Sequence, residues 1–541
     1  MNSILADWLK SQKINKRVKD YILKMSDADK ERYFSYEKLN FGTAGIRATI
    51  GPGTTQINVF TYQQMAEGAA KHFKQIKENP SIIVAHDNRR NADAYAMIVA
   101  KVLTNFGINV WLYKDNQLKA TPIVSYTIRK KQMDGAIIIT ASHNPKNYLG
   151  FKVYNHTGGQ ILPEECESIR NLMPNNDLIL NSAYMSNMDL INYFDDSITD
   201  EYFEDAKTCL IKTDCKEDKN FPIVFTSHHG TASQDLPAFL EKLGYNRVIC
   251  VKQQCVPDPN FTHSPISNPE DKESFRLSLK YAEQVNANVM LAVDPDSDRL
   301  AVVVKHKGEW KYLTGNEMGL IFAHYVLSNK KFEKSPFIVS TYVSTYLTDK
   351  IASHFGAKVY RTPTGFKWLG NVIEKTYQEA DFVVAFEEAI GSLNSTIGRD
   401  KDGFQAAALA LEIIYEYSKQ EKTLVDILEK EIFPTYGYWS GETVSYTIQG
   451  ANWQEEMQDR LRKLSQFKCD EICGIIMTSN KWNAEADALE WEFQNGMWVK
   501  FRLSGTEPKF KVYYNFYGES LEEVQDRLKS FKEYISDIIR R

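Results

Sequence analysis

The sequence contains no C-x-x-C pair and no run of about 20 apolar residues. Its seven cysteines are scattered, and the nearest spacings, Cys250 to Cys255 and Cys469 to Cys473, fit no usual zinc-binding pattern. We therefore expect reduced thiols in a cytoplasmic protein. The missing apolar run excludes a membrane-spanning helix, and the N-terminal segment lacks the apolar core and the small-residue cleavage site of a signal peptide.

The sequence also lacks an excess of charge of either sign. Its 65 basic and 70 acidic side chains give a formal net charge of -5. This balance gives no reason to expect a nucleic-acid or membrane partner. No long apolar heptad pattern or interface stripe is visible either, so we expect a monomer or a weak dimer.

What the sequence does have is a series of short apolar runs of strand length, separated by longer amphipathic stretches. This alternation is typical of βαβ units and of mixed, largely parallel sheets. Ligands bind outside the carboxyl ends of the strands in such sheets, so we expect the chemistry in the polar loops directly after the runs. The runs are SIIVAHD (81–87), INVWLYK (108–114), GAIIIT (135–140), FPIVFTSHHG (221–230), ANVMLAVDPDSD (287–298), PFIVST (336–341) and DFVVAFEE (381–388).

The chain of 541 residues is several times the usual length of a domain, so several domains are expected. A polar, acidic segment at 175–218 indicates the outer edge of the first domain. After Pro434 the pattern changes to period-two alternation mixed with helical stretches, which is typical of a smaller α+β unit. We predict three α/β domains at residues 1–205, 206–318 and 319–434, and an α+β domain at 435–541.

The loop DPDSDR follows the strand-like run NVMLAV and carries three carboxylates at alternate positions, Asp294, Asp296 and Asp298. Three such groups repel one another unless a cation neutralises them, and ligands that are all oxygen suit a hard divalent ion such as Mg²⁺. Arg299 can contact a phosphate held by the same metal. The alternative is an acidic turn; the glycine and the distal glutamate of an EF-hand are absent.

The segment RLSGTEPKFKVY places Ser504, Gly505 and Thr506 in a turn. It is flanked by Arg502 and, further on, by Lys511. Backbone N–H groups, hydroxyls and cations that converge on one loop can bind a phosphate dianion. A hairpin turn with basic flanks is the alternative.

Three further loops have polar side chains that suit a binding site. Arg47 lies in FGTAGIRATIGPG, where the glycines indicate a sharp turn or a close approach. TPTGFKWLGN and FEEAIGS bring Lys367, Glu387 and Glu388 to strand ends, where these side chains could bind sugar hydroxyls. Taken singly, a turn explains the first loop and a solvated rim explains the other two.

Ser142 lies in TASHNPKNYLGFKVY, directly after the run GAIII. A hydrolase nucleophile would need G-x-S-x-G before a helix, whereas FKVYN predicts another strand. His143 is the next residue on what we expect to be an extended backbone, which disfavours a Ser-His relay. A hydroxyl beside a metal cluster can instead accept and return a phosphoryl group. A hydroxyl in a turn remains the other interpretation.

Five motifs in this order, GTAGIR, TASHNP, DPDSDR, TGFKW with FEEAIG, and SGTEP, resemble those of the α-D-phosphohexomutase superfamily. The resemblance covers about residues 35 to 520. The spellings FGTAGIR, FEEAIG and RLSGTEPK are most similar to the branch that contains phosphoglucomutase-2, which has phosphoglucomutase and phosphopentomutase activity. Bacterial phosphomannomutases and phosphoglucomutases share this branch.

The resemblance implies a phosphosugar mutase with four domains around a central cleft. A phosphoryl group would move between C1 and C6 of glucose or mannose, or between C1 and C5 of a pentose, through a phosphoserine at Ser142. A sugar 1,6-bisphosphate or ribose 1,5-bisphosphate would be the intermediate and activator. Mg²⁺ would be held by this phosphoserine and by Asp294, Asp296 and Asp298.

The resemblance also implies roles for the other motif residues. Arg47, His143 and Lys152 complete the expected catalytic set, with Lys152 a candidate general acid or base. The SGTEP loop would bind the phosphate that does not react. The expected substrate-binding residues are Arg299, Thr364, Gly365, Lys367, Glu387, Glu388, Lys401, Arg502, Ser504, Gly505, Thr506 and Lys511.

The sequence departs from the family pattern at three positions. Ala389 stands where many hexomutases have a serine, which loses one hydroxyl contact and leaves a pentose phosphate open as substrate. Gly391 stands where some relatives have a histidine, so Lys152 or Lys401 could take over its acid/base role. Lys511 stands where many have arginine, which removes a bidentate phosphate contact.

Three alternatives to the mutase are a phosphohydrolase with an aspartate nucleophile, a silent sugar-phosphate binding protein and a bisphosphate synthase of the same family.

Overall fold

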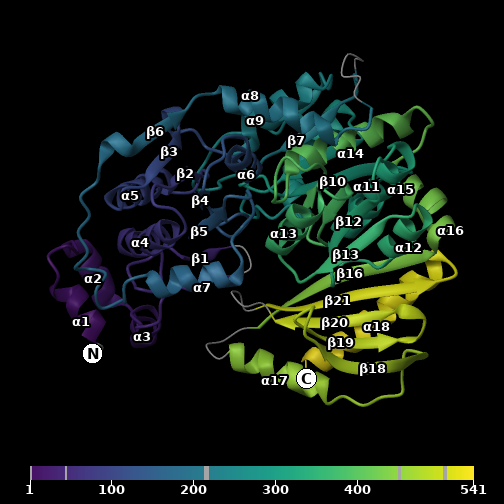
Figure 1. Cartoon of the computed structure of the whole chain (residues 1–541). Coiled ribbons are helices and arrows are strands. Elements are labelled where there is room, and N and C mark those ends of the chain that lie inside the picture. Colours follow the sequence, from purple (N-terminus) through teal and green to yellow (C-terminus); the bar gives the residue numbers. More distant parts are fainter. Residues whose placement is uncertain (1–2, 43–44, 213–218, 449–452, 504–508, 541) are drawn as a thin grey trace. The chain divides into compact units, whose positions relative to one another are not determined.

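The computed structural model describes residues 3–42, 45–212, 219–448, 453–503 and 509–540. The chain forms two compact units, one of residues 1–302 with 395–408 and the other of residues 303–394 with 409–541. Each unit is made of two separate stretches of the sequence, which can be followed in Figure 1 by the colours that run along the chain. No helix in the described ranges has the length and apolar character needed to cross a bilayer.

The first unit begins with three short helices that have a small core of their own. The buried side chains of Ile4, Leu5 and Trp8 pack with Ile22 and Phe34 in this core. The helices are α1 (Ser3–Lys10), α2 (Lys16–Lys24) and α3 (Asp27–Tyr33).

The first sheet has six strands in the order β1-β5-β4-β2-β3-β6. Strands β2, β3, β4 and β6 run parallel, whereas β5 is antiparallel to both β4 and β1. The strands are β1 (Ile46–Thr49), β2 (Ser81–His86), β3 (Asn109–Tyr113), β4 (Gly135–Ile139), β5 (Tyr148–Asn155) and β6 (Ile191–Phe194). The helices are α4 (Val59–Ile76), α5 (Ala92–Asn105), α6 (Thr121–Lys130) and α7 (Pro163–Leu172).

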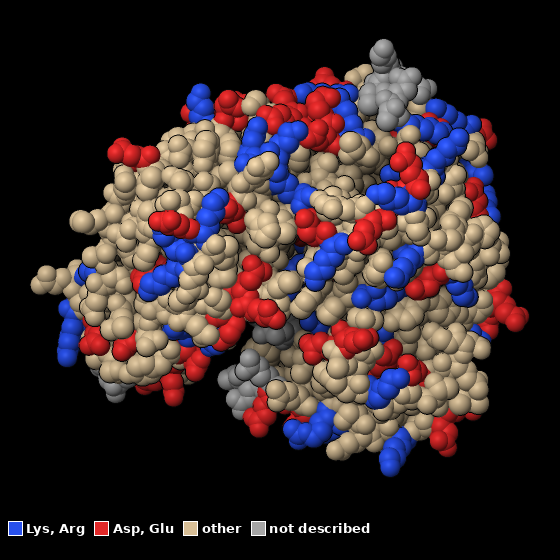
Figure 2. All heavy atoms as spheres, viewed as in Figure 1, with Lys and Arg blue, Asp and Glu red and all other residues tan. Residues whose placement is uncertain are grey.

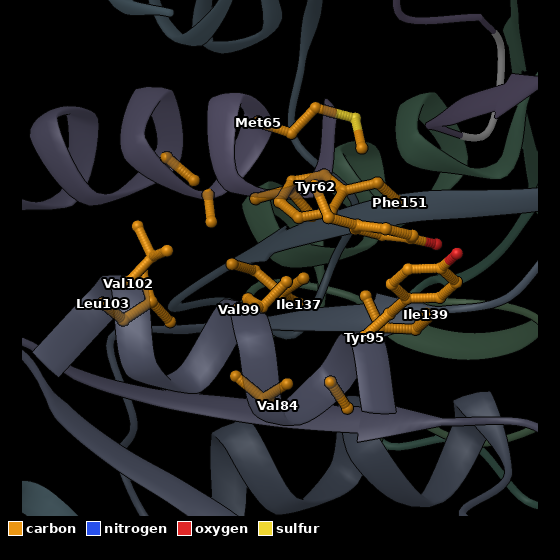
Figure 3. Packing of buried hydrophobic residues seen from close by; sticks show 14 of the residues in the cluster. Tyr62, Met65, Val84, Tyr95, Val99, Val102, Leu103, Ile137, Ile139 and Phe151 are labelled. Atoms are coloured by element: carbon orange, nitrogen blue, oxygen red, sulfur yellow. The ribbon is translucent and has the colours of Figure 1, made fainter. Parts of the chain in front are cut away.

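The core of this domain is made by side chains of α4 and α5 together with the sheet. Figure 3 shows Tyr62 and Met65 of α4 opposite Val99 of α5, with Ile137 of β4 close by. Tyr62 stacks on Tyr95 with ring centroids 4.4 Å apart. The apolar, largely β-branched run of β4 is buried along its whole length, as expected for a central parallel strand.

The strand order places the loops after β2 and β4 at a topological switch point. The chain passes from β2 through α5 to β3 on one side, and then returns through α6 to β4 on the other side of β2. The carboxyl ends of β2 and β4 therefore border the crevice where ligands bind in open α/β sheets.

The second sheet repeats this order, with β9-β7-β8 in the place of β4-β2-β3. The strands are β7 (Ile223–Thr226), β8 (Val248–Cys250), β9 (Val289–Val293), β10 (Leu300–His306) and β11 (Glu309–Leu313). The helices are α8 (Ser197–Ala206), α9 (Ala232–Lys242) and α10 (Arg276–Val285).

The third sheet, in the second unit, has the same order once more, with β14-β12-β13. Its strands are β12 (Pro336–Thr341), β13 (Lys358–Thr362), β14 (Asp381–Phe386) and the short β15 (Ser392–Leu393). The helices that follow β11 are α11 (Gly315–Asn329), α12 (Leu347–His354), α13 (Phe366–Thr376), α14 (Gly403–Ser418), α15 (Leu424–Ile427) and α16 (Phe433–Tyr436).

The fourth sheet is antiparallel and has the strand order β16-β21-β20-β19-β18-β17 (green-yellow to yellow in Figure 1). It has a separate core that includes Trp491, Phe501, Phe516 and Phe531. The strands are β16 (Tyr438–Thr447), β17 (Glu471–Ile472), β18 (Ile475–Asn483), β19 (Ala488–Phe493), β20 (Trp498–Leu503) and β21 (Lys509–Gly518). The helices are α17 (Trp453–Ser465) and α18 (Leu521–Arg540).

These sheets confirm the predicted fold class of three α/β domains with mixed sheets and a C-terminal α+β domain. Each of the seven apolar runs contains a strand, and the strand predicted for FKVYN is part of β5. Sequence reasoning missed β6, where only Phe194 is buried, because an edge strand with one buried residue has no clear apolar pattern. On the face drawn in Figure 2, acidic and basic side chains are interspersed, in keeping with the near balance of charges.

Candidate active site

The loop after β4 presents Ser142 at the carboxyl end of the first sheet. Ser142 is buried and its φ is +52°, so the backbone is left-handed here rather than extended as we expected. The Ser142 N–H donates to Thr140 Oγ1 at 2.9 Å, and this hydroxyl donates to Asp87 Oδ2 at 2.7 Å. The Ser142 hydroxyl donates to Asp294 Oδ2 at 2.6 Å. The two strongest candidates of the sequence, the serine and the acidic loop, therefore meet directly.

Arg89, at the end of β2, fixes this loop through its main chain. Its guanidinium donates to the carbonyl oxygens of Ser142 at 2.6 Å, Asn144 at 2.5 Å, Pro145 at 2.9 Å and Tyr148 at 3.0 Å. The buried carboxylate of Asp87 lies 3.2 Å from Arg89 Nε. A charged group that satisfies so many buried carbonyls holds the serine loop in one conformation.

Sequence reasoning missed Asp87 and Arg89. The available signal was their position: both follow directly after β2, which borders the same switch point as the serine loop.

The acidic loop after β9 brings three buried carboxylates together. Ligand oxygens of Asp294, Asp296 and Asp298 lie within 4.8 Å of one another. The Oδ1 atoms of Asp296 and Asp298 are buried and have no hydrogen bond to any described residue. Oxygen donors that converge and are left unsatisfied fit a hard divalent cation.

Neighbouring residues also donate hydrogen bonds to this acidic loop. Thr121 donates its N–H to the Asp296 carbonyl at 2.9 Å and its hydroxyl to Asp296 Oδ2 at 3.1 Å. The Arg299 N–H donates to Asp294 Oδ1 at 3.2 Å. Burial, together with the charges of Asp296 and Asp298, raises the pKa of Asp294 well above its usual range.

Two lysines converge on the acidic cluster. The Lys152 ammonium, carried by β5, lies 2.6 Å from Asp296 Oδ2 and 3.1 Å from Asp298 Oδ2. Lys401 Nζ lies 3.2 Å from Asp298 Oδ2. Burial opposes ionisation of Asp298, but the two ammonium groups outweigh it and lower its pKa. Burial would lower the pKa of Lys152, yet the two carboxylates raise it, so Lys152 is held as a cation.

The remaining predicted residues of the first unit lie around this cluster. Arg47 of β1 donates to Asn144 Oδ1 at 2.9 Å, so it contacts the serine loop. Arg299 pairs with Glu270 at 3.2 Å, and its Nε is 3.9 Å from Asp298 Oδ1. His143 is half-buried, and its carbonyl accepts a hydrogen bond from Ser267 at 3.2 Å.

In the second unit, the predicted sugar loops meet each other. The Gly365 N–H donates to Glu387 Oε1 at 2.8 Å, and Gly365 has a φ of +115° that favours glycine. Glu388 Oε2 accepts from the Thr341 hydroxyl at 3.4 Å. Thr364 and Lys367 lie on either side of Gly365, at the start of α13. The Thr364 hydroxyl is buried and makes no hydrogen bond to a described residue.

Arg502 and Lys511 face each other across β20 and β21. Burial raises the pKa of the Tyr513 hydroxyl, Glu388 adds to the rise, and Arg502 and Lys511 oppose it. Tyr513 is thus a common neighbour of the predicted sugar loop and of the cations that flank the predicted phosphate loop. Ser504, Gly505 and Thr506 lie outside the described residues.

Three protein-family models match the chain. They are the Phosphoglucomutase/phosphomannomutase alpha/beta/alpha domain I at residues 38–179, domain II at residues 200–308 and domain III at residues 314–433. The matches cover the three domains whose sheets share one strand order.

Whole-length relatives give the same result. The chain is 44% identical over 540 residues to a phosphomannomutase of Mycoplasmoides pirum, and the match covers 99% of each. It is 30% identical over 550 residues to a phosphoglucomutase of Staphylococcus saprophyticus subsp. saprophyticus, covering 96% of this chain and 98% of the relative. The open form of a phosphoglucomutase from Paramecium matches with a TM-score of 0.68 and 18% identity, over 94% of this chain and 96% of that one, which is a likeness of fold.

Proposed function

Because the chain belongs to the α-D-phosphohexomutase superfamily and is a phosphosugar mutase, an intramolecular phosphotransferase, we propose that Ser142 carries the transferred phosphoryl group between turnovers. The observation that supports this most is the contact of the Ser142 hydroxyl with Asp294 Oδ2 at 2.6 Å, in a cluster that also holds Lys152. The left-handed backbone at Ser142 and the hydrogen bond from Arg89 to the Ser142 carbonyl hold that hydroxyl in place.

We propose that Asp294, Asp296 and Asp298 hold Mg²⁺ together with the phosphoserine. The unsatisfied Oδ1 atoms of Asp296 and Asp298 support this assignment. The bound ion would neutralise charge on the phosphoryl group as it moves. The Lys152 ammonium contacts Asp296 and Asp298, so the protein also supplies a positive charge at this site.

The proposed reaction has two transfers that use one set of groups. The phosphoserine donates its phosphoryl group to the free hydroxyl of a sugar phosphate, which gives a bisphosphate and a free Ser142 hydroxyl. The bisphosphate turns end for end, and its other phosphate returns to Ser142. Arg47 and Lys152 would lie beside the moving group, with His143 nearby, and Lys152 or Lys401 is the candidate general acid or base. Exclusion of water protects the phosphoserine from hydrolysis.

The predicted substrate-binding residues of the second unit would bind sugar hydroxyls and a phosphate. We assign sugar hydroxyl contacts to Glu387 and Glu388 and to the turn of Thr364, Gly365 and Lys367. Arg502 and Lys511, with Ser504, Gly505 and Thr506, would bind the phosphate that does not react. Arg299 would contact phosphate on the first unit.

The proposed substrates are the 1-phosphates and 6-phosphates of glucose or mannose, since the relatives are named phosphomannomutase and phosphoglucomutase. Ala389 in the sugar loop also makes the 1- and 5-phosphates of ribose or deoxyribose worth testing. A sugar 1,6-bisphosphate, or ribose 1,5-bisphosphate, would act as activator. We further propose a cytoplasmic monomer or weak dimer with the domain limits 1–205, 206–318, 319–434 and 435–541.

The test is an isomerisation assay with Mg²⁺ and a trace of bisphosphate, run in parallel with a phosphate-release assay. We expect conversion of glucose or mannose 1-phosphate to the 6-phosphate, little free phosphate, and one phosphate per chain by intact mass. Steady phosphate release without isomerisation would support the phosphohydrolase alternative instead. A chain that isomerises no sugar phosphate would overturn the assignment.

A further inference from the structure

A fourth buried carboxylate, Asp400, shares the Lys401 ammonium with Asp298 of the acidic cluster. Asp400 is 1% exposed and precedes Lys401 in the segment RDKDG between β15 and α14. Its Oδ1 accepts from the Lys401 N–H at 2.9 Å and lies 3.4 Å from Lys401 Nζ. One oxygen of Asp400 therefore contacts both the main chain and the ammonium group of Lys401.

The other oxygen of Asp400 is occupied by two neutral donors. Its Oδ2 accepts from the Tyr154 hydroxyl and from Gln160 Nε2, both at 2.7 Å. Tyr154 is fully buried on β5 and lies two residues after Lys152, so the two side chains project from the same face of the strand. The carboxylate thus has a fixed orientation set by β5 and the loop that follows it.

This arrangement controls where the Lys401 ammonium lies. A lysine side chain has a flexible stem and can point a single charge in many directions. Here the ammonium is placed between Asp400 Oδ1 at 3.4 Å and Asp298 Oδ2 at 3.2 Å. Asp298 Oδ2 is also the atom that Lys152 contacts at 3.1 Å. Both lysines reach one carboxylate oxygen, and Asp400 holds the second of them there.

We infer that Asp400 is a positioning residue for the mutase reaction, which holds Lys401 against Asp298 and is itself oriented by Tyr154 and Gln160. The inference rests on the proposed function, because it takes the Asp298 cluster as the place where the phosphoryl group moves. Removal of a residue that orients a group at the active site in this way typically lowers activity by about 10- to 100-fold.

The neighbouring Asp402 provides a matched control. It is equally buried and accepts from the Tyr202 hydroxyl at 2.8 Å. It also accepts from the N–H groups of Phe404 and Gln405, so it caps the start of α14, and from Gln405 Nε2 at 2.7 Å. Tyr154→Phe and Tyr202→Phe each remove one buried hydroxyl from an aspartate, but only the first aspartate contacts Lys401.

The experiment compares the variants Tyr154→Phe, Asp400→Asn and Lys401→Met with Tyr202→Phe. We expect Asp400→Asn to lower kcat/KM by roughly 10- to 100-fold, Tyr154→Phe by about 10-fold, and Tyr202→Phe by less than about 3-fold. Asp400→Asn should divide its loss between kcat and KM in the same proportion as Lys401→Met. Adding Asp400→Asn to Lys401→Met should change the rate little further, since both act through one ammonium group.

Two results would overturn the inference: losses that multiply in the double variant, or a Tyr154→Phe variant no worse than Tyr202→Phe. A crystal structure of Asp400→Asn gives a readout that does not depend on activity, and Lys401 Nζ should have left Asp298 in it. An ammonium that stays there contradicts positioning by Asp400. If the wild-type chain isomerises no sugar phosphate, the proposed function fails, and the crystal structure still decides whether Asp400 holds Lys401.

Discussion

The loop after β4 and the loop after β9 occupy the same place in two copies of one strand order. Each follows the strand that borders the switch point, and each contains a serine with a left-handed backbone, Ser142 at φ +52° and Ser297 at φ +62°. The Ser142 hydroxyl meets a carboxylate of Asp294, whereas the Ser297 hydroxyl lies 2.8 Å from the hydroxyl of Thr231. The fold sets where a serine stands, and the neighbour of its hydroxyl sets what the serine can do.

The two loops are also held by different means. Arg89 holds the first loop by donating to its carbonyl groups. The second loop is held by close main-chain packing, because Thr231 N–H donates to the Pro295 carbonyl at 2.8 Å and a Cβ on Gly230 would lie 2.4 Å from Pro295 Cα. A cation fixes the serine loop, and a glycine allows the approach that fixes the acidic loop.

The largest expected effect separates the two serines. Ser142→Ala should lower isomerisation by roughly three orders of magnitude or more, since it removes the proposed carrier of the phosphoryl group. Its intact mass should show no bound phosphate. Ser297→Ala removes a hydroxyl whose one hydrogen-bond partner among the described residues is Thr231, so its rate should stay within about 3-fold of the wild type. An equal loss of isomerisation rate in the two variants would contradict the different roles that we assign to the two serines.

The next effect concerns the charges around the acidic loop. Asp298→Asn leaves the buried ammonium groups of Lys152 and Lys401 with less compensation, so the free energy of unfolding without metal should fall by about 3 kcal/mol. Denaturant unfolding in the presence of a chelator measures this. The Ser297→Ala variant is the control, and unchanged stability of Asp298→Asn would contradict the ion pairs.

A pH effect should come from Asp402, whose segment packs on the acidic loop through the Gly403 N–H and the Ser297 carbonyl at 3.2 Å. Burial raises the pKa of Asp402 to about 6 from the ordinary value of 3.8. The folded state therefore binds more protons between these values, so stability should fall by about 2 kcal/mol as pH rises from about 4 to 6.

The comparison for this effect is Asp402→Asn, which should lack that part of the pH dependence. Unfolding free energies of both proteins, measured at a series of pH values from 4 to 7, provide the test. Parallel curves for the two proteins would show that Asp402 has no raised pKa.

The smallest effect tests how the acidic loop is held. Gly230→Ala places a methyl group against the main chain of Pro295, so we expect a loss of about 1 to 3 kcal/mol in unfolding free energy and weaker metal binding. Thermal unfolding and Mn²⁺ binding measure the two quantities. A variant with unchanged metal affinity would show that the acidic loop does not depend on this close approach.

The sequence was sufficient to predict the three α/β domains and the loops that carry Ser142 and Asp294, because apolar runs and strand ends are local patterns. Arg89 and Asp87 could not be recognised as partners of the serine loop, since the contact joins residues 53 positions apart. The contact of Lys401 with Asp298 likewise depends on the folded chain. Patterns in sequence predict elements, whereas the partners of a buried charge depend on how distant segments pack.

Residues 395–408 belong to the first unit, although they follow Val302 by more than ninety positions in the sequence. A ribosome that has just completed Val302 must add more than ninety residues before Lys401 exists, which takes roughly 5 to 20 s at usual rates of synthesis. During that interval the nascent chain holds all three aspartates without one of their two ammonium partners. The charges around the acidic loop are therefore assembled in the order of translation, and the Lys401 ammonium is added last.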